Sequence, residues 1–133
     1  MNLFRIIFRR RRTHHTRRRR KSSNRRDFLK YKEFARAIVC ERVQYWRTIY
    51  GISVRKIAIR NQRTRWGSCS KRGNLNFNYR IVHLPLRLAD YLIVHELCHL
   101  KEFNHSKEFW ALVGQNIPNY GKLRGELRKM KLS

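Results

Sequence analysis

Apolar residues recur at intervals of three and four between positions 27 and 50. This spacing predicts an amphipathic helix that buries one face against a core. Asn24 or Asp27 can cap its first turn, and Gly51 is suited to end it. The apolar stripe consists of Tyr31, Ala35, Ile38, Val39, Val43, Trp46, Ile49 and Tyr50.

A different period follows this helix. Residues 52–60 are rich in β-branched side chains and predict a strand, whereas residues 60–72 are polar and turn-rich. Residues 73–79, GNLNFNY, alternate between apolar residues and asparagine. That alternation indicates a half-buried strand, which we expect in a small antiparallel sheet.

The C-terminal part reads as three more helices. Residues 85–103 are apolar nearly all round, which predicts a central, enclosed helix with Pro85 in its first turn. Ser106 can cap the next helix, Pro118 ends it, and a last basic helix covers about 119–130. The predicted fold class is therefore α+β, and 133 residues suit one domain with a modest core.

Charge divides the chain into two parts. The net charge is +25, and residues 1–26 hold 12 of the 33 Lys and Arg residues and no acid. We predict that 1–26 is a disordered arginine-rich arm and that 27–133 is the folded domain. Such an arm suits nucleic acid or another polyanion, bound without sequence preference. The candidate contacts are Arg9, Arg10, Arg11, Arg12, Arg17, Arg18, Arg19 and Arg20.

Other features of composition concern location. No apolar run reaches 18 residues, so we expect no membrane span, and the N-terminus lacks the pattern of a secretory signal. Cys40, Cys69 and Cys98 are scattered and odd in number, which favours three buried thiols over a disulfide framework. We therefore expect a cytoplasmic protein.

The stretch HELCHLKEFNH, residues 95–105, carries the clearest chemistry. On a helix, His95 and His99 project from one face about 6 Å apart along the axis, a separation at which two imidazoles can share one zinc ion. Glu96 lies beside them and can act on water at the metal. His105 can join as a third ligand only if the chain turns back before it, and we expect Asn104 to make that turn in the left-handed conformation. Three neutral imidazoles leave a fourth position open, as in catalytic zinc sites.

Several motifs occur together with this stretch. RWGSCS at 65–70, GNLNFNYR at 73–80, VHELCHLKEFNHSKEFWALV at 94–113 and IPNY at 117–120 resemble the YgjP-like metallopeptidases, relatives of the SprT-like and WLM zincins. The resemblance covers about residues 52–128. It implies a minimal zincin fold, in which a small sheet packs on the HExxH helix. It also implies a zinc-dependent peptidase with His95, His99 and His105 as ligands of one zinc ion and Glu96 as catalytic base.

Further residues near the motif are candidates for supporting roles. Tyr79 and Arg80, with His83, precede the site helix and are candidates for substrate binding at the oxyanion. A peptide substrate could pair with an exposed edge of the strand at 73–79. The Glu102 side chain is a candidate partner for an imidazole N–H, and Glu108 or Glu126 is an alternative third ligand to His105.

Two other functions remain compatible with these residues. One is a zinc-dependent hydrolase of nucleotide phosphoanhydrides, because metal-activated water can attack phosphorus and a basic surface attracts phosphates. The other is a nucleic-acid-binding module in which zinc is only structural. Loss of activity without loss of zinc in Glu96→Gln separates the enzymes from the module.

Overall fold

The computed structural model describes residues 14–132, and their side chains from Asn24 onward. It confirms the α+β class, with four α-helices, three strands and one 3₁₀ helix in this part of the chain. The elements in order are α1 (His14–Tyr50), β1 (Lys56–Arg60), β2 (Gly67–Cys69), β3 (Asn74–Asn78), η1 (Tyr79–His83), α2 (Leu86–His99), α3 (Lys107–Gly114) and α4 (Tyr120–Lys129).

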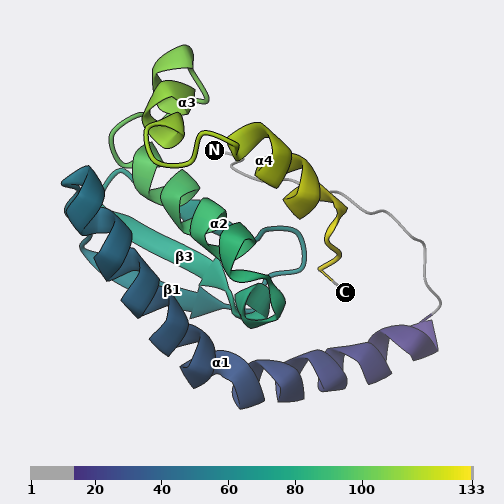
Figure 1. Cartoon of the computed structure of the whole chain (residues 1–133). Coiled ribbons are helices and arrows are strands. Elements are labelled where there is room, and N and C mark those ends of the chain that lie inside the picture. The colour runs from purple at the N-terminus through teal and green to yellow at the C-terminus, as the bar shows by residue number, and fades with distance from the viewer. Residues whose placement is uncertain (1–13, 133) are drawn as a thin grey trace.

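The first helix is longer than the sequence predicts. It begins at His14 rather than near residue 27, and its N-terminal part extends beyond the rest of the domain (Figure 1). Arg and Lys are good helix formers, so a basic segment can continue a helix that packing stabilises further along. The helix ends as predicted at Gly51, whose φ of 64° is one that glycine adopts without strain. Residues 1–13, including Arg9–Arg12, lie outside the described residues, and the division at residue 26 stays a prediction.

The sheet is mixed rather than antiparallel. Its order is β1-β3-β2, with β2 antiparallel and β1 parallel to β3. The short strand β2 lies inside the stretch interpreted as turns. Gly73, at φ 88°, ends the β2–β3 turn, and its carbonyl accepts a hydrogen bond of 2.8 Å from the Arg55 N–H. Because β3 is paired on both sides, the expected exposed edge of this strand does not exist.

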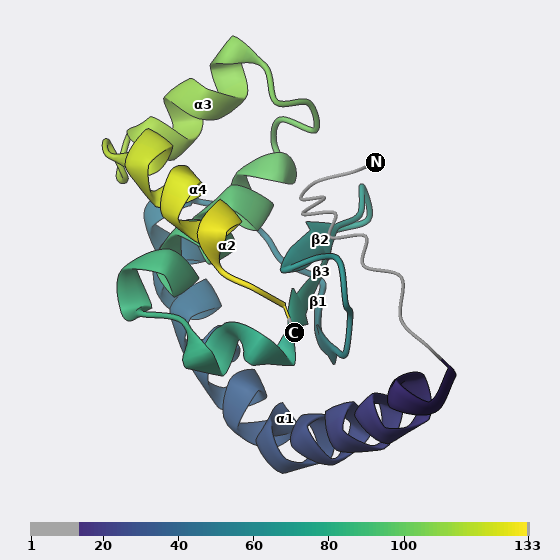
Figure 2. The ribbon, with the colours of Figure 1, turned by 90° about the vertical axis from the view of Figure 1, so that its right-hand side faces the viewer.

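Helix α2 is the centre of the core. Figure 2 shows α2, α3 and α4 on one side of the sheet. Leu75 and Phe77 of β3 are buried, and so are Val39 and Val43 of α1. Two hydrogen bonds of 2.7 and 2.9 Å from Arg42 to Asp90 join α1 to α2 beside this core. The central, enclosed position predicted for the HExxH helix is thus what the structure has.

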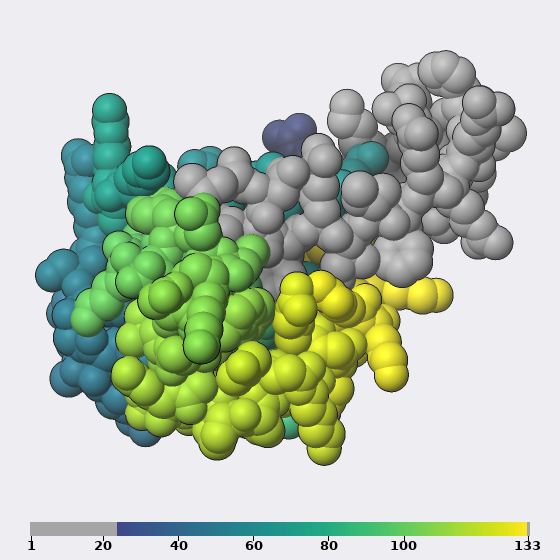
Figure 3. Space-filling model, turned by 90° about the horizontal axis from the view of Figure 1, so that it is seen from above, coloured from purple at the N-terminus to yellow at the C-terminus, as the bar shows by residue number. Residues whose placement is uncertain are grey.

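The last two helices close the domain over α2. The Ser106 hydroxyl accepts a hydrogen bond from the Phe109 N–H and caps α3, as predicted. Seen from above, α3 and α4 lie next to each other (Figure 3), and the Trp110 and Tyr120 rings stack between them. No helix of the described chain has the length and apolar character that crossing a membrane requires.

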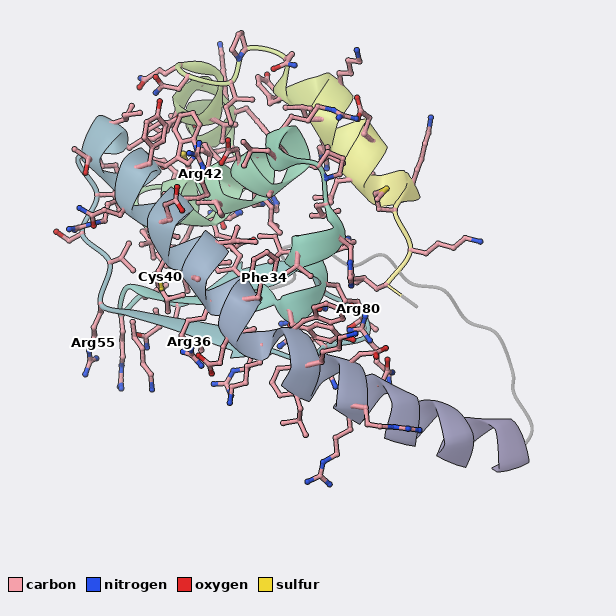
Figure 4. The ribbon with its side chains drawn as sticks, turned by 60° about the horizontal axis from the view of Figure 1, so that its bottom comes forward. Phe34, Arg36, Cys40, Arg42, Arg55 and Arg80 are labelled. Atoms are coloured by element: carbon pink, nitrogen blue, oxygen red, sulfur yellow. The ribbon has the colours of Figure 1, made fainter. Side chains whose placement is uncertain are left out.

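The cysteines match the prediction only in part. Cys98 on α2 is buried, Cys69 is half-buried, and Cys40 is exposed. Cys40 lies on the side of α1 that faces solvent (Figure 4), so its prediction as a buried thiol is wrong.

Candidate metal centre

Three imidazoles converge at the C-terminal end of α2. The Nε2 atoms of His95 and His99 are 3.0 Å apart, and that of His105 lies 3.0 Å from His99 Nε2 and 3.2 Å from His95 Nε2. His95 and His99 are buried, whereas His105 is exposed, so the cluster opens to solvent on the His105 side. Three nitrogens bound to one tetrahedral ion at about 2.0–2.1 Å would lie about 3.3 Å apart, close to what is found.

The third histidine reaches the cluster because α2 ends early. The helix stops at His99 instead of near residue 103, and its last turn tightens through bonds from the Leu100 and Lys101 N–H groups to carbonyls three residues back. No residue other than glycine has a positive φ in the described chain, so the expected left-handed turn at Asn104 is wrong. The five residues between His99 and His105 carry the chain back without a positive φ.

The contacts of the Nδ1 atoms of His95 and His99 orient their rings, so that Nε2 points into the cluster. His99 Nδ1 lies 3.0 Å from the Glu102 carbonyl oxygen, which can only accept a hydrogen bond, so Nδ1 carries the proton and Nε2 keeps its lone pair. His95 Nδ1 lies 3.5 Å from the hydroxyl of buried Tyr91. Partners of this kind orient metal-binding histidines. The lone pairs of the cluster would repel one another unless a cation lies between them.

Burial also sets the charge state of the cluster. It lowers the pKa of His95 far below its usual value, with His99, His105 and Arg124 acting in the same direction. Burial lowers the pKa of His99 to about 4. The pKa of His105 is also lowered, mainly by burial and secondly by the positive charge of Arg124. The three rings are therefore neutral near pH 7, which is the form that binds metal ions.

Glu96 completes the centre. It is fully buried on α2, and neither carboxylate oxygen has a hydrogen-bond partner among the described residues. Burial raises its pKa to about 8, although nearby Arg65 acts in the opposite direction. A buried carboxylate without partners is costly unless a cation or water compensates it. The donor set and this carboxylate together fit a divalent metal ion.

The glycine of the RWGSCS motif leaves space for Glu96. A Cβ at Gly67 would lie 3.1 Å from the Asn76 carbonyl oxygen and 3.2 Å from Glu96 Cγ. We expect the added methyl group of Gly67→Ala to push Glu96 aside or to separate β2 from β3. Either change should lower the free energy of unfolding by about 1–3 kcal/mol. Activity should fall with it, because 1 Å errors at catalytic groups cost rate. Denaturant unfolding and peptide hydrolysis measure the two effects.

Gly125→Ala is the matched control. A Cβ there meets nothing within 4 Å, and the residue lies in α4, where alanine is the better helix former. This variant should be as stable as the parent or more so. If Gly67→Ala behaved the same way, close packing of β2 on Glu96 would be refuted.

Aromatic side chains of α3 and α4 border the histidines. Phe109 stacks on His99 at 4.2 Å between centroids, and Trp110 stacks on His105 at 5.8 Å. Tyr120 stacks on Trp110, and the Arg124 guanidinium lies 5.1 Å from the Trp110 centroid. The periodicity of α3 predicts inward-facing Phe109 and Trp110, but it contains no signal that they face the metal ligands.

The structure does not bring the predicted substrate-binding residues to the histidines. Tyr79 and Arg80 are buried where η1 meets α1. The Arg80 guanidinium donates to Asn24 Oδ1 at 2.7 Å and to the Gln62 carbonyl at 3.1 Å (Figure 4 labels Arg80). Tyr79 packs edge-on against Phe28 of α1, and His83 packs against Tyr31. These contacts assign all three to the attachment of α1.

The alternative ligands also lie elsewhere. Glu126 is paired with Arg87 at 2.7 Å, and Glu108 is exposed in the first turn of α3. The metal-binding group found among the described residues contains neither. Glu102 does contact His99, but through its backbone carbonyl rather than the carboxylate that the sequence suggests.

Comparison with known proteins identifies the family to which this chain belongs. The sequence model of the YgjP-like metallopeptidase domain matches residues 4–130. The chain belongs to the YgjP-like metallopeptidase family. The family match begins well before residue 52, so it includes α1 and most of the basic N-terminal segment.

A solved structure supports the same fold. The crystal structure of the metallopeptidase zymogen of Pyrococcus abyssi abylysin matches with a TM-score of 0.62 and 22% sequence identity. The match covers 67% of this chain and 90% of the abylysin chain. Among curated proteins, no sequence matches significantly. Membership in the family implies a metal ion and a peptide or protein substrate.

Proposed function

We propose that this protein is a zinc-dependent peptidase whose single zinc ion is held by His95, His99 and His105. One observation carries the proposal: three Nε2 atoms lie 3.0–3.2 Å apart, and Glu96, the residue after His95 on the same helix, has a buried carboxylate without a hydrogen-bond partner. Imidazole suits zinc among the divalent metals, and three protein ligands with one open position are typical of catalytic zinc.

Glu96 would act as the general base. Bound zinc would supply Lewis acidity, lowering the pKa of a coordinated water to about 7 and polarising the scissile carbonyl. The Glu96 carboxylate would take a proton from the attacking water and return it to the leaving amine. A positioned base of this kind contributes about 10²–10⁴ to the rate. Its burial suits this role, because a carboxylate enclosed by the protein is not solvated by bulk water, which would weaken it as a base.

The substrate strand would pair with β2 rather than β3. Among the described strands, β3 is flanked on both sides, whereas β2 pairs only with β3. Gly67 of β2 also lies directly against Glu96. An extended peptide added to the outer edge of β2 would therefore run past the catalytic carboxylate, with main-chain hydrogen bonds holding it.

The carboxylate also weighs against a purely structural zinc. Structural sites are closed by four protein ligands, and the described residues supply three. A buried Glu96 with no partner has no function in such a site. The phosphoanhydride hydrolase is distinguished by its product, since it would release phosphate from nucleotides. Binding of a polyanion by the arm, and a cytoplasmic location, remain predictions alongside the peptidase.

Removal of the metal tests the proposal. We expect the purified chain to hydrolyse a denatured protein substrate, to lose that activity in a zinc chelator and to regain it with about one equivalent of zinc. Restored nucleotide hydrolysis with no peptide hydrolysis would contradict a peptidase and favour the phosphoanhydride enzyme. Activity that survives complete loss of metal would contradict both.

A further inference from the structure

The sheet has an outer face that the metal centre does not use. Gly67 faces Glu96, and Gly67 is in register with Phe77, so this side of the sheet packs on α2. Side chains alternate along a strand, and residues in register point the same way. The opposite face is therefore made of Lys56, Ala58 and Arg60 from β1, Ser68 from β2, and Asn74, Asn76 and Asn78 from β3.

This outer face is polar and open to solvent. Apart from Asn78 at one end, which is buried, none of its residues is buried, and Lys56 and Arg60 are exposed. Asn76 bridges the strands, accepting from Arg60 Nε at 3.4 Å and donating to the Ser68 hydroxyl at 3.3 Å. It presents no large apolar or aromatic side chain, so it can neither enter a lipid interface nor stack on bases.

Positive charge is arranged at both ends of this face. No Asp or Glu occurs from residue 42 to residue 89. Arg60 and Arg63 are exposed at one end of β1. At the other end, the hydrogen bond from Arg55 to Gly73 brings the β2–β3 turn beside Lys56. The exposed bases gathered at that second end are Arg55, Lys56, Lys71 and Arg72.

These bases are not neutralised by the protein. The ion pairs found in the described chain all lie on helices. None of them involves an exposed base at either end of the face, that is Arg55, Lys56, Arg60, Arg63, Lys71 or Arg72. Figure 4 shows the Arg55 side chain directed away from the helices. Lys56 and Arg60 are four residues apart on β1, so the two ends are separated by about 13 Å. That is long enough to meet several phosphates of one strand, which are about 3.4 Å apart along a duplex axis.

We propose that this outer sheet face binds the phosphate backbone of a nucleic acid without reading its sequence. Two groups of exposed cations that form no ion pair, with amide and hydroxyl groups between them, match a row of phosphates, and the strands and turns of the face contain no acid. Lys71 also lies 5.6 Å from the ring of Phe103, in the loop that carries His105. The end of the face that carries Lys71 is therefore the end nearer the loop that holds His105.

The test compares two double variants of the full-length chain that remove equal charge. Lys56→Gln with Arg60→Gln removes one base from each end of the face, and Lys122→Gln with Lys129→Gln removes two exposed bases from α4. Binding to a fluorescent DNA duplex of about 20 base pairs is measured against salt. We expect the sheet variant to bind about tenfold more weakly and to lower the salt slope by about two, since each lost phosphate contact accounts for about 0.9. The α4 variant should keep the parent slope.

Further measurements keep the result unambiguous. Ala58→Glu places an acid in the middle of the face and should weaken binding as strongly, with zinc content unchanged in all variants. Equal weakening in both double variants would overturn the proposal, because net charge alone would then govern binding. Vesicles rich in phosphatidylserine that bind with the same dependence on Lys56 and Arg60 would overturn it in favour of a membrane surface. The proposal does not depend on peptidase activity.

Discussion

Glu96→Gln should lower the rate of peptide hydrolysis by about 10²–10⁴-fold while zinc stays bound. The amide has nearly the shape of the carboxylate but cannot accept a proton. In the structure the carboxylate is fully buried on α2, directly after His95 in the chain, and it is not part of the three-histidine group. Hydrolysis of a fluorogenic peptide, measured together with zinc content, checks both halves of this expectation.

The control for this variant lies on the same motif. Glu102→Gln changes a half-buried side chain whose backbone carbonyl, not its carboxylate, contacts His99. Its activity should stay within a few-fold of the parent. Equal losses in both variants would show that a carboxylate near the site matters only through general electrostatics. Full activity in Glu96→Gln would exclude Glu96 as the base.

His99→Ala should weaken zinc binding by about 100-fold and lower activity with it. Zinc binds to four-ligand peptides with about 10–16 kcal/mol, so one lost ligand corresponds to about 3 kcal/mol, or on the order of 10² in affinity. His99 is the middle nitrogen of the cluster, at 3.0 Å from both of the others. Its ring also stacks on Phe109, so the domain should lose some stability as well. Competition with a zinc-sensitive dye measures the affinity.

His83→Ala provides the comparison for the loss of a histidine as such. His83 is exposed in η1 and contacts Tyr31, well away in sequence from the cluster. It should bind zinc with the affinity of the parent. Unchanged zinc affinity in His99→Ala would instead place the metal at other residues.

The sequence predicts the most about elements that depend on local rules. Gly51 ends α1 and Ser106 caps α3, each through conformations or hydrogen bonds that those residue types favour anywhere. The i, i+4 spacing of His95 and His99 fixes their common face once the segment is helical. The early end of α2 could not be predicted, because Leu100 and Phe103 continue the apolar pattern.

Long-range pairings were the part that local patterns did not reveal. The three-residue strand β2 forms because the turn at Gly73 places it against β3, not because Gly67–Cys69 favours a strand. Its presence makes β3 the central strand and moves the free edge to β2. The attachment of Arg80 to Asn24 likewise joins residues 56 positions apart, so proximity in sequence to the HExxH helix was misleading for Tyr79 and Arg80.

The most direct test of the account is a crystal structure of the zinc-loaded chain, with anomalous scattering recorded on both sides of the zinc edge. The account predicts one anomalous peak per chain, about 2.0–2.1 Å from Nε2 of His95, His99 and His105, with Glu96 near but not bound. A peak bound by only two of these histidines, or by residues elsewhere, would contradict it.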